Sequence, residues 1–343
     1  MNTVALYRKY RPQAFDEVRG QDHVVKVLQG ALEQHHVGHA YLFTGGRGTG
    51  KTSVARIFAR ALGTHDTDLY EIDAASNRGV DDARALRDAV ATLPFHSPYK
   101  VYIIDEAHML TKEAFNALLK TLEEPPAHVI FILATTELHK ILDTIISRCE
   151  VHTFKQPTRD MLKEHVVSLA KKEGFTLEHA AGDLIALLAE GSFRDATGIL
   201  QKVIYASSDK KVGVDEVSLI TSAPRATYVN ALVTSLHTGD PTGALDALHT
   251  AAHEGVDMNV MSKLVLEKLR AILLLRYAPD MKKQFSEEFS ETDMALLHEY
   301  ATAQPARITS TTLARFLDVH TAISRAYLPH LPLELAIIDS TTK

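Results

Sequence analysis

Residues 45–52 read Gly45-Gly46-Arg47-Gly48-Thr49-Gly50-Lys51-Thr52. This stretch matches the phosphate-binding pattern G-x-x-x-x-G-K-[ST], and it lies between a predicted strand at 40–43 and a predicted helix at 52–62. Glycines allow backbone N–H groups to wrap phosphates, and the positive end of the following helix adds its dipole. A chance glycine-rich turn would rarely have both flanks and the Lys-Thr ending, so the stretch predicts a nucleotide-binding loop.

Four side chains near this loop are candidates for the chemistry. Lys51 would reach the β- and γ-phosphates, and Thr52 would hold Mg²⁺. The apolar run 101–104 is followed by two acids, Asp105 and Glu106. Asp105 can hold the magnesium directly or through water, and Glu106 is placed to polarise an attacking water. An acidic pair of this kind after a phosphate loop favours hydrolysis over transfer to a second substrate.

Strand and helix signals alternate around the loop. Short β-rich runs lie at 40–43, 69–72, 101–104, 129–133 and 151–154. Helical stretches between them lie at 52–62, 81–92 and 112–123. The central runs are almost continuously apolar, as expected for strands that are buried on both faces of a parallel sheet. The alternation predicts an α/β layer fold.

The character of the sequence changes after Gln156-Pro157-Thr158, where strand signals nearly vanish. Amphipathic helices are predicted at 162–171, 177–190 and 194–205. A second break falls at Ser222-Ala223-Pro224, and the remainder reads as helical too. We therefore predict an α/β domain at 1–157, a small helical domain at 158–222 and a helical C-terminal domain at 223–343.

The composition is that of an ordinary globular protein, with 45% hydrophobic and 23% charged residues among 343. No apolar run approaches the ~20 residues that span a bilayer, and the N-terminus lacks a secretory signal, so we expect a cytoplasmic protein without membrane contact. The single cysteine, Cys149, excludes a disulfide framework and a cysteine-based zinc site. Because the net charge is −6, contact with nucleic acid requires a local basic patch or other subunits.

Other motifs are ambiguous on their own. Thr135 and Thr136 follow a strand and could sense a phosphate or orient a water, but threonine at a strand end more often reflects β-propensity. Arg148 and Arg194 are each part of a short polar motif, yet most arginines are solvated surface residues. Residues 105–108 also match the Asp-Glu-Ala-His signature of one helicase class. That class needs a second recombinase-like α/β domain, which the strand-poor sequence after residue 160 does not supply.

Several segments carry a family resemblance when they are taken together. They are Tyr7-Arg8-Lys9-Tyr10-Arg11-Pro12, Phe15-Asp16-Glu17-Val18 with Gly20-Gln21, His39-Ala40-Tyr41-Leu42-Phe43, Glu71-Ile72-Asp73-Ala74-Ala75-Ser76, Asp105-Glu106-Ala107-His108-Met109-Leu110, Phe115-Asn116-Ala117-Leu118-Leu119-Lys120-Thr121-Leu122-Glu123-Glu124-Pro125-Pro126, and Ser147-Arg148-Cys149. The chain resembles the AAA+ ATPase subunit (gamma/tau) of a bacterial DNA polymerase III clamp loader over residues 4–222, and more weakly beyond. The Ser-Arg-Cys motif and the Asn-Ala-Leu-Leu-Lys run separate clamp loaders from most other AAA+ ATPases.

The resemblance implies an AAA+ P-loop domain, a helical lid and a collar domain for oligomerisation, with ATP and Mg²⁺ as ligands. It implies nucleotide contacts from Tyr7, Arg11, Val18, Gly45, Gly46, Arg47, Gly48, Thr49, Gly50, Lys51, Thr52 and Ser53. The first three belong to the segment that closes over the adenine. Thr136 resembles sensor 1, and Arg194 resembles sensor 2 of the lid. Arg148 resembles the arginine finger that acts on the ATP of the adjacent subunit.

The resemblance also implies partners. These are loader subunits of the delta and delta-prime type, copies of the chain itself, a sliding clamp and primer–template DNA. The implied function is to open the clamp and load it on primed DNA during replication, driven by ATP hydrolysis. The family is often catalogued with the DNA-directed DNA polymerase, although every acid identified here belongs to an ATPase site.

Three departures from the family pattern matter. Only Gly63-Thr64-His65-Asp66-Thr67-Asp68 stands where members usually carry a four-cysteine zinc module, so we expect no zinc. Arg78 and Arg84 replace a more basic stretch, and a DNA contact and a solvated helix face fit them equally well. The sequence ends at Lys343 without the tail through which the longer form binds polymerase and helicase, so we expect no such tethering unless the sequence is truncated.

Two other functions remain as alternatives. One is a different AAA+ machine, such as a Holliday-junction motor or a recombination-associated ATPase, which would lack the Ser-Arg-Cys motif. The other is a loader scaffold that does not hydrolyse ATP, which the intact Lys51, Thr52, Asp105 and Glu106 argue against.

Overall fold

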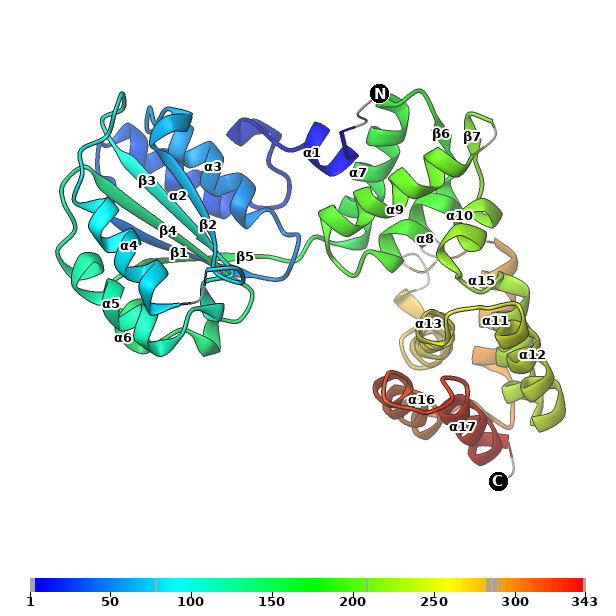
Figure 1. The fold of residues 1–343 in the computed structure, drawn as a ribbon. Helices are drawn as coiled ribbons and strands as arrows, with labels where there is room; N and C mark the ends of the chain where they lie inside the picture. The colour runs from blue at the N-terminus through cyan, green and yellow to red at the C-terminus, as the bar shows by residue number, and fades with distance from the viewer. Residues whose placement is uncertain are drawn as a thin grey trace. The chain divides into compact units, whose positions relative to one another are not determined.

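The computed structural model describes residues 4–341, apart from 78, 208, 282–284, 286–288 and 290. The chain folds into two compact units (Figure 1). The first consists of Met1–Leu169 and Ala189–Gln201, and the second of Ala170–Leu188 and Lys202–Lys343. The three-domain division at 157 and 222 stays a prediction. No helix among the described residues is long and apolar enough to cross a membrane.

The first unit is built on a sheet of five parallel strands in the order β2-β3-β4-β1-β5 (Figure 1). The strands are β1 (Ala40–Gly45), β2 (Leu69–Asp73), β3 (Lys100–Asp105), β4 (Val129–Thr135) and β5 (Glu150–Phe154). Because the strands are parallel, all their carboxyl ends meet at one edge, which we call the carboxyl edge. In open α/β sheets ligands bind at this edge, where the strand order reverses, and here it reverses at β1.

Alternating strand residues build two apolar layers, one on each face of the sheet. Leu42 of β1 packs in the layer that contains Leu86 of α4 and Leu118 of α5. Phe43, the next residue, packs in the layer that contains Phe58 of α3 and Leu28 of α2. The helices of the first unit are α1 (Leu6–Lys9), α2 (Asp22–Glu33), α3 (Lys51–Ala61), α4 (Val80–Val90), α5 (Lys112–Glu123) and α6 (Asp143–Ile146), with the 3-10 turns η1 (Phe15–Glu17), η2 (Asp66–Asp68), η3 (Ala107–Met109) and η4 (Leu138–Lys140). The two layers explain why the central strands are apolar on both faces.

The described residues of the second unit are helical apart from one pair of two-residue strands, β6 (Thr176–Leu177) and β7 (Lys211–Val212). Helices α7 (Arg159–Lys172) and α9 (Phe193–Ala206) contribute residues to both units. The other helices are α8 (His179–Leu188), α10 (Val214–Thr221), α11 (Ala226–Thr238), α12 (Pro241–His253), α13 (Met258–Tyr277), α15 (Glu291–Thr302), α16 (Ser310–Ile323) and α17 (Leu331–Thr341), with the 3-10 turn η5 (Pro279–Met281). Helix α13 is the centre of the C-terminal core, because it packs against α11, α15 and α16 and buries residues such as Leu269 and Ile272.

Candidate functional site

The phosphate-binding loop connects the end of β1 to the start of α3, at the carboxyl edge of the sheet. Gly45 has a φ of +147°, and a Cβ there would lie 2.4 Å from the carbonyl oxygen of Phe154. Gly48 has a φ of +69°, and a Cβ there would lie 1.9 Å from Ser192 Oγ. Both positions combine a left-handed backbone with a close neighbour, so they require glycine. Within the loop, Thr49 Oγ1 donates to the carbonyl oxygen of Gly46 at 2.9 Å.

Lys51 and Thr52 are the first residues of α3, which Gly50 precedes with a left-handed backbone. The Lys51 Nζ donates to the carbonyl oxygens of Gly45 and Gly46, each at 2.8 Å. Burial lowers the pKa of Lys51, and the nearby carboxylates of Glu106 and Asp105 oppose this effect. An ammonium is therefore held within the loop itself, at the end of a strand and the start of a helix.

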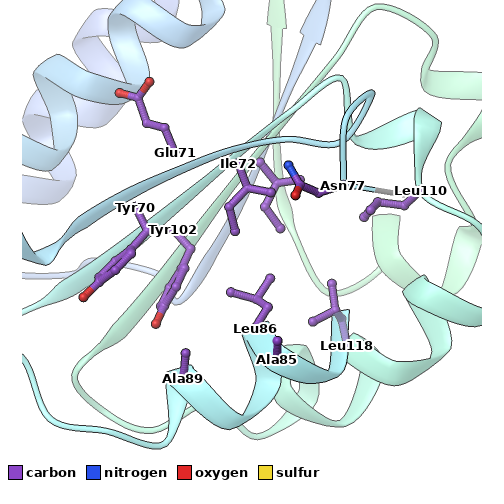
Figure 2. Close-up of a pocket in the computed structure, with 11 residues that line it drawn as sticks. Tyr70, Glu71, Ile72, Asn77, Ala85, Leu86, Ala89, Tyr102, Leu110 and Leu118 are labelled. Atoms are coloured by element: carbon purple, nitrogen blue, oxygen red, sulfur yellow. The ribbon is translucent and has the colours of Figure 1, made fainter. Parts of the chain in front are cut away.

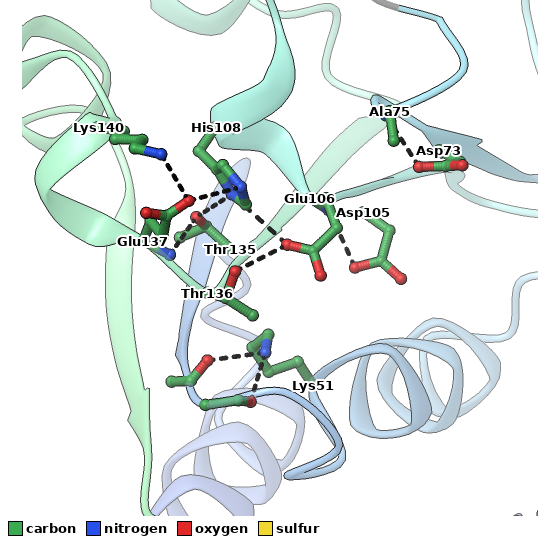
Figure 3. Close-up of polar contacts among 12 residues, drawn as sticks. Lys51, Asp73, Ala75, Asp105, Glu106, His108, Thr135, Thr136, Glu137 and Lys140 are labelled. Atoms are coloured by element: carbon green, nitrogen blue, oxygen red, sulfur yellow. Dashed lines mark hydrogen bonds and ion pairs between the residues drawn. The ribbon is translucent and has the colours of Figure 1, made fainter. Parts of the chain in front are cut away.

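The two predicted acids lie at the end of β3. Thr52 Oγ1 donates to Asp105 Oδ2 at 2.9 Å, so the predicted pair of magnesium ligands is in direct contact. Glu106 has a left-handed backbone with φ 48° and ψ 44°, a conformation that costs a non-glycine residue about 1–3 kcal/mol and that clusters at functional sites. Thr136, directly after β4, donates from Oγ1 to Glu106 Oε2 at 3.1 Å (Figure 3).

His108 also belongs to this group, although the sequence alone assigns it no role at the site. The His108 ring lies between Glu106 and Glu137, with Nδ1 3.5 Å from Glu106 Oε2 and Nε2 3.1 Å from Glu137 Oε2 (Figure 3). Nδ1 is also 3.0 Å from Thr135 Oγ1. No pattern in the sequence marks Glu137 as a site residue, because its position depends on how the segment after β4 turns back toward η3.

The N-terminal segment contacts the start of α3. Arg11 Nε donates to Ser53 Oγ at 3.0 Å, and burial lowers the pKa of Arg11. Val18 packs against the apolar layer that includes α2 and α3. Gln21, which we had not predicted as a site residue, is buried and fastens this segment to the sheet. Its side chain donates to the carbonyl oxygen of Lys155 at 2.7 Å and accepts from the same residue's N–H at 3.0 Å.

The start of α9 lies against the phosphate-binding loop within the first unit. The Phe193 N–H donates to the carbonyl oxygen of Gly48 at 3.1 Å. Arg47 and Asp195 form an exposed ion pair at 3.8 Å. The Arg194 guanidinium lies over the Tyr7 ring at 5.1 Å from its centroid, within cation–π range. A hydrogen bond from Arg8 is the largest cause of the lowered pKa of Tyr7, and Arg194 adds to it.

Arg148 lies at the opposite edge of the sheet from the loop. It precedes β5, which begins at Glu150 opposite Tyr41 and ends at Phe154 opposite Gly45. Four residues of strand separate the two edges by about 13 Å. Arg148 is anchored locally, by an ion pair of 2.6 Å to Glu123 Oε1 and a bond of 2.6 Å to the Thr144 carbonyl oxygen. The structure therefore does not bring Arg148 to the phosphate-binding loop of its own chain.

The segment before β2, where we expect no zinc, is organised by one carboxylate. Asp68 accepts backbone N–H groups from Phe95 at 2.6 Å, His96 at 2.9 Å and Ser97 at 3.0 Å. Across the described part of the chain, no group of three or more His, Cys, Asp or Glu residues could hold a metal ion. Zinc absence itself stays a prediction.

Of the two arginines considered for DNA, Arg84 is exposed on α4, and Arg78 lies outside the described residues.

We expect Asp68→Asn to lower the free energy of unfolding by about 1–3 kcal/mol at neutral pH, because an amide cannot accept all three N–H groups. Burial alone would raise the pKa of Asp68, but the three N–H groups and the Ser97 hydroxyl lower it to about 2. A depressed pKa means that this stabilisation is present above the unfolded value of about 4 and is lost as pH falls toward 2. Denaturant unfolding measured from pH 7 to pH 2 should show that the difference in free energy of unfolding between the wild type and Asp68→Asn becomes smaller as the pH falls. An equal difference at every pH, or none, would contradict this, and Asp88→Asn on the exposed face of α4 is the control.

A cavity of about 390 Å³ lies elsewhere on the first unit, between β2, α4 and α5 (Figure 2). The rings of Tyr70 and Tyr102 stack beside it with centroids 5.0 Å apart. Its lining is otherwise mainly apolar, and none of the predicted site residues belongs to it. The cavity therefore has no part in the nucleotide site described above.

Two family models match this chain. The model described as DNA polymerase III, delta subunit, matches residues 20–79 and 63–158. The model described as DNA polymerase III subunits gamma and tau domain III matches residues 223–341. Together the two models cover the sheet with its phosphate-binding loop and the C-terminal helices.

Curated relatives and solved structures are also similar to the chain. DNA polymerase III subunit tau of Bacillus subtilis is 43% identical, over 82% of this chain and 54% of the relative. Subunit gamma/tau of Mycobacterium tuberculosis is 35% identical, over 97% of this chain and 61% of the relative. Subunit tau of Escherichia coli is 37% identical, over 81% of this chain and 46% of the relative. The chain thus spans about half to three fifths of the length of these relatives.

Among solved structures, the Thermotoga maritima RuvB Holliday junction branch migration motor has a TM-score of 0.53 at 23% identity, over 66% of this chain and 79% of that chain. This similarity shows a shared fold alone. The predicted α/β AAA+ fold is confirmed.

Proposed function

The chain belongs to the gamma/tau family of bacterial DNA polymerase III subunits, and from this premise we propose that it is an ATP-hydrolysing motor subunit of a clamp loader. In this role it binds and hydrolyses ATP to open a sliding clamp and to load it on primed DNA. The observation that carries the proposal is the constellation at the carboxyl edge of the sheet. There Lys51, the Thr52–Asp105 pair and the Thr136–Glu106 pair converge on one loop.

The residues present fit ATP and Mg²⁺. The backbone from Gly45 to Gly50 has the glycines that a phosphate cradle requires, and Lys51 would leave its loop carbonyls for the β- and γ-phosphates. Thr52 and Asp105 already touch and would hold the magnesium, with Ser53 next to them on α3. Bound magnesium would neutralise charge that develops on the phosphates. Glu106 would orient the attacking water, and Thr136 would hold that carboxylate.

The remaining contacts to the nucleotide come from the N-terminal segment and from α9. Tyr7, Arg11 and Val18 would close over the adenine. Arg194 would report the nucleotide to the helical lid. In support, Arg11 bonds Ser53 beside the phosphate-binding loop, and Arg194 stacks on Tyr7. Arg47, which pairs with Asp195, would also link the phosphate-binding loop to α9.

Arg148 would complete the ATP site of the adjacent subunit. Its place at the opposite edge of the sheet from its own loop supports action in trans. For this role the ion pair between Arg148 and Glu123 would have to open. Because both side chains are partly exposed, breaking the pair would cost little free energy. One folded chain is then an incomplete enzyme, and assembly switches it on.

Assembly would involve the C-terminal helices from residue 223, acting as a collar. The partners would be copies of this chain, subunits of the delta and delta-prime type, a sliding clamp and primer–template DNA. Because the net charge is −6, DNA would be held through backbone contacts by the whole assembly. A polymerase classification would belong to the holoenzyme, since the acids at this site serve ATP hydrolysis.

The test is the steady-state ATPase rate of the chain assembled with its partner loader subunits. We expect strong stimulation that needs both the sliding clamp and a primer–template junction. Omitting either the clamp or the junction should return the rate to the basal level. Turnover that ignores the clamp and responds to branched DNA would contradict the proposal and favour a junction motor. Absence of turnover in every assembly would favour a scaffold.

A further inference from the structure

The ring of His108 does not touch the phosphate-binding loop, yet its surroundings set the position of the proposed general base. Its side chain is only 6% exposed. It lies in η3, two residues after Glu106, whose left-handed backbone reverses the chain so that both side chains reach toward the end of β4 (Figure 3). Polar groups are costly to bury without partners. The two carboxylates that flank the buried His108 ring are therefore the contacts to consider when a role is sought for it.

Within the part of the chain that the structure describes, the contacts to the Glu106 carboxylate fall on a single oxygen. Thr136 Oγ1 donates to Oε2 at 3.1 Å, and His108 Nδ1 lies 3.5 Å from the same oxygen. Nδ1 also lies 3.0 Å from Thr135 Oγ1, which holds the ring beside Glu106. The two neighbours on Oε2 restrict the rotation of the carboxylate and leave Oε1 available for a water. A general base must be held within hydrogen-bond reach of the proton that it takes, so the orientation of this carboxylate matters directly for the rate.

The ring is itself fixed from the far side. Nε2 lies 3.1 Å from Glu137 Oε2, and the Glu137 backbone N–H donates to Thr135 Oγ1 at 3.0 Å. Lys140 donates to Glu137 Oε2 at 2.8 Å. The Lys140 hydrogen bond is the largest cause of the lowered pKa of Glu137, which keeps this carboxylate charged. A ring held at both nitrogens cannot swing away, whereas a glutamate side chain on its own has several rotamers.

We propose that His108 is a positioning residue for ATP hydrolysis, which bridges Glu137 to Glu106 and so holds Glu106 in the orientation that activates water. This inference rests on the proposed function, because it assigns Glu106 the role of general base. His108 touches neither nucleotide nor magnesium in this scheme. Its loss should therefore affect the chemical step and leave nucleotide binding intact.

Three variants in the assembled loader separate the two nitrogens. We expect His108→Ala to lower kcat about 10- to 100-fold, the order of loss that a misplacement of 1 Å produces, with the affinity for a non-hydrolysable ATP analogue unchanged. His108→Asn keeps a donor near the position of Nδ1 and should recover much of the rate. His108→Gln keeps a polar group near Nε2 and should recover less. His39→Ala is a matched control, because the His39 ring lies 3.1 Å from the Leu122 carbonyl oxygen at the other edge of the sheet.

Glu137→Gln gives an independent check of the bridge. It should lower kcat by part of the His108→Ala loss, and it should add nothing in the His108→Ala background, since residues in one network are not additive. An unmodified assembly without turnover contradicts the proposed function. If the unmodified assembly is active, three results would contradict the role of His108 and leave the proposed function standing. They are a rate for His108→Ala equal to the unmodified rate, a loss of analogue affinity that parallels the loss of kcat, and a rate for His108→Asn no higher than that of His108→Ala.

Discussion

Replacing Arg148 by alanine is expected to lower ATP turnover by the assembled loader about 10³- to 10⁵-fold, the range that an arginine finger supplies. The reason is geometric. Arg148 precedes β5 at the edge of the sheet opposite the phosphate-binding loop, so its charge is available to a neighbouring subunit and not to its own site. The variant should bind ATP with unchanged affinity in its own loop. Steady-state ATPase rates and equilibrium binding of an ATP analogue measure the two quantities.

Two further variants test whether a positive charge at position 148 is sufficient for turnover. Arg148→Lys keeps the charge but loses the planar fork that can clasp a phosphate, so it should remain far below the wild-type rate. Arg60→Ala removes an arginine on α3 that bonds Gln13, and it should leave the rate unchanged. A rate for Arg148→Ala within a few-fold of wild type would contradict the finger assignment.

Replacing Glu106 by glutamine should lower the rate of hydrolysis about 10²- to 10⁴-fold, the contribution of a positioned general base. The amide retains the size of the side chain and can still accept from Thr136, so the fold should persist. Lys51, Thr52 and Asp105 are untouched, and nucleotide affinity should be preserved. Single-turnover hydrolysis in the assembly, together with analogue binding, separates chemistry from binding.

The matched control for Glu106→Gln is Asp73→Asn. Asp73 pairs in register with Asp105 at the same edge of the sheet, but its carboxylate is used by the N–H of Ala75 and the hydroxyl of Ser76. Its replacement should leave hydrolysis within about twofold, since it removes no group from the proposed reaction. Equal losses for the two variants would mean that general electrostatics at this edge, and not a base at Glu106, governs the rate.

The sequence predicted the central fold well, because its signals are local. The apolar run at 129–133 and the acid-terminated run at 101–104 fall within β4 and β3, and the helix predicted at 112–123 matches α5. The strands at 176–177 and 211–212 were missed. Two residues are too short to show a period, and this pair forms only through a partner distant in the sequence.

The candidate site was predictable in part. The phosphate-binding loop and the two acids follow from spacing and from the ends of strands. Thr136, Arg148 and Arg194 were raised above other residues only by family resemblance. The contact between Gly48 and Ser192, the fastening role of Gln21 and the bridge from Glu137 through His108 depend on tertiary approach. Nothing in the local sequence around these residues marks such an approach.

The most direct test of a site shared between subunits is a mixing experiment with two inactive proteins. Lys51→Ala removes the loop lysine but keeps the finger, and Arg148→Ala removes the finger but keeps the loop. In assemblies formed from an equal mixture, with clamp and primed DNA, about a quarter of the interfaces between copies should pair an intact loop with an intact finger, if the copies associate at random. The account predicts that ATP turnover returns in the mixture while each variant alone stays inactive. No recovery, in assemblies that demonstrably contain both variants, would contradict it.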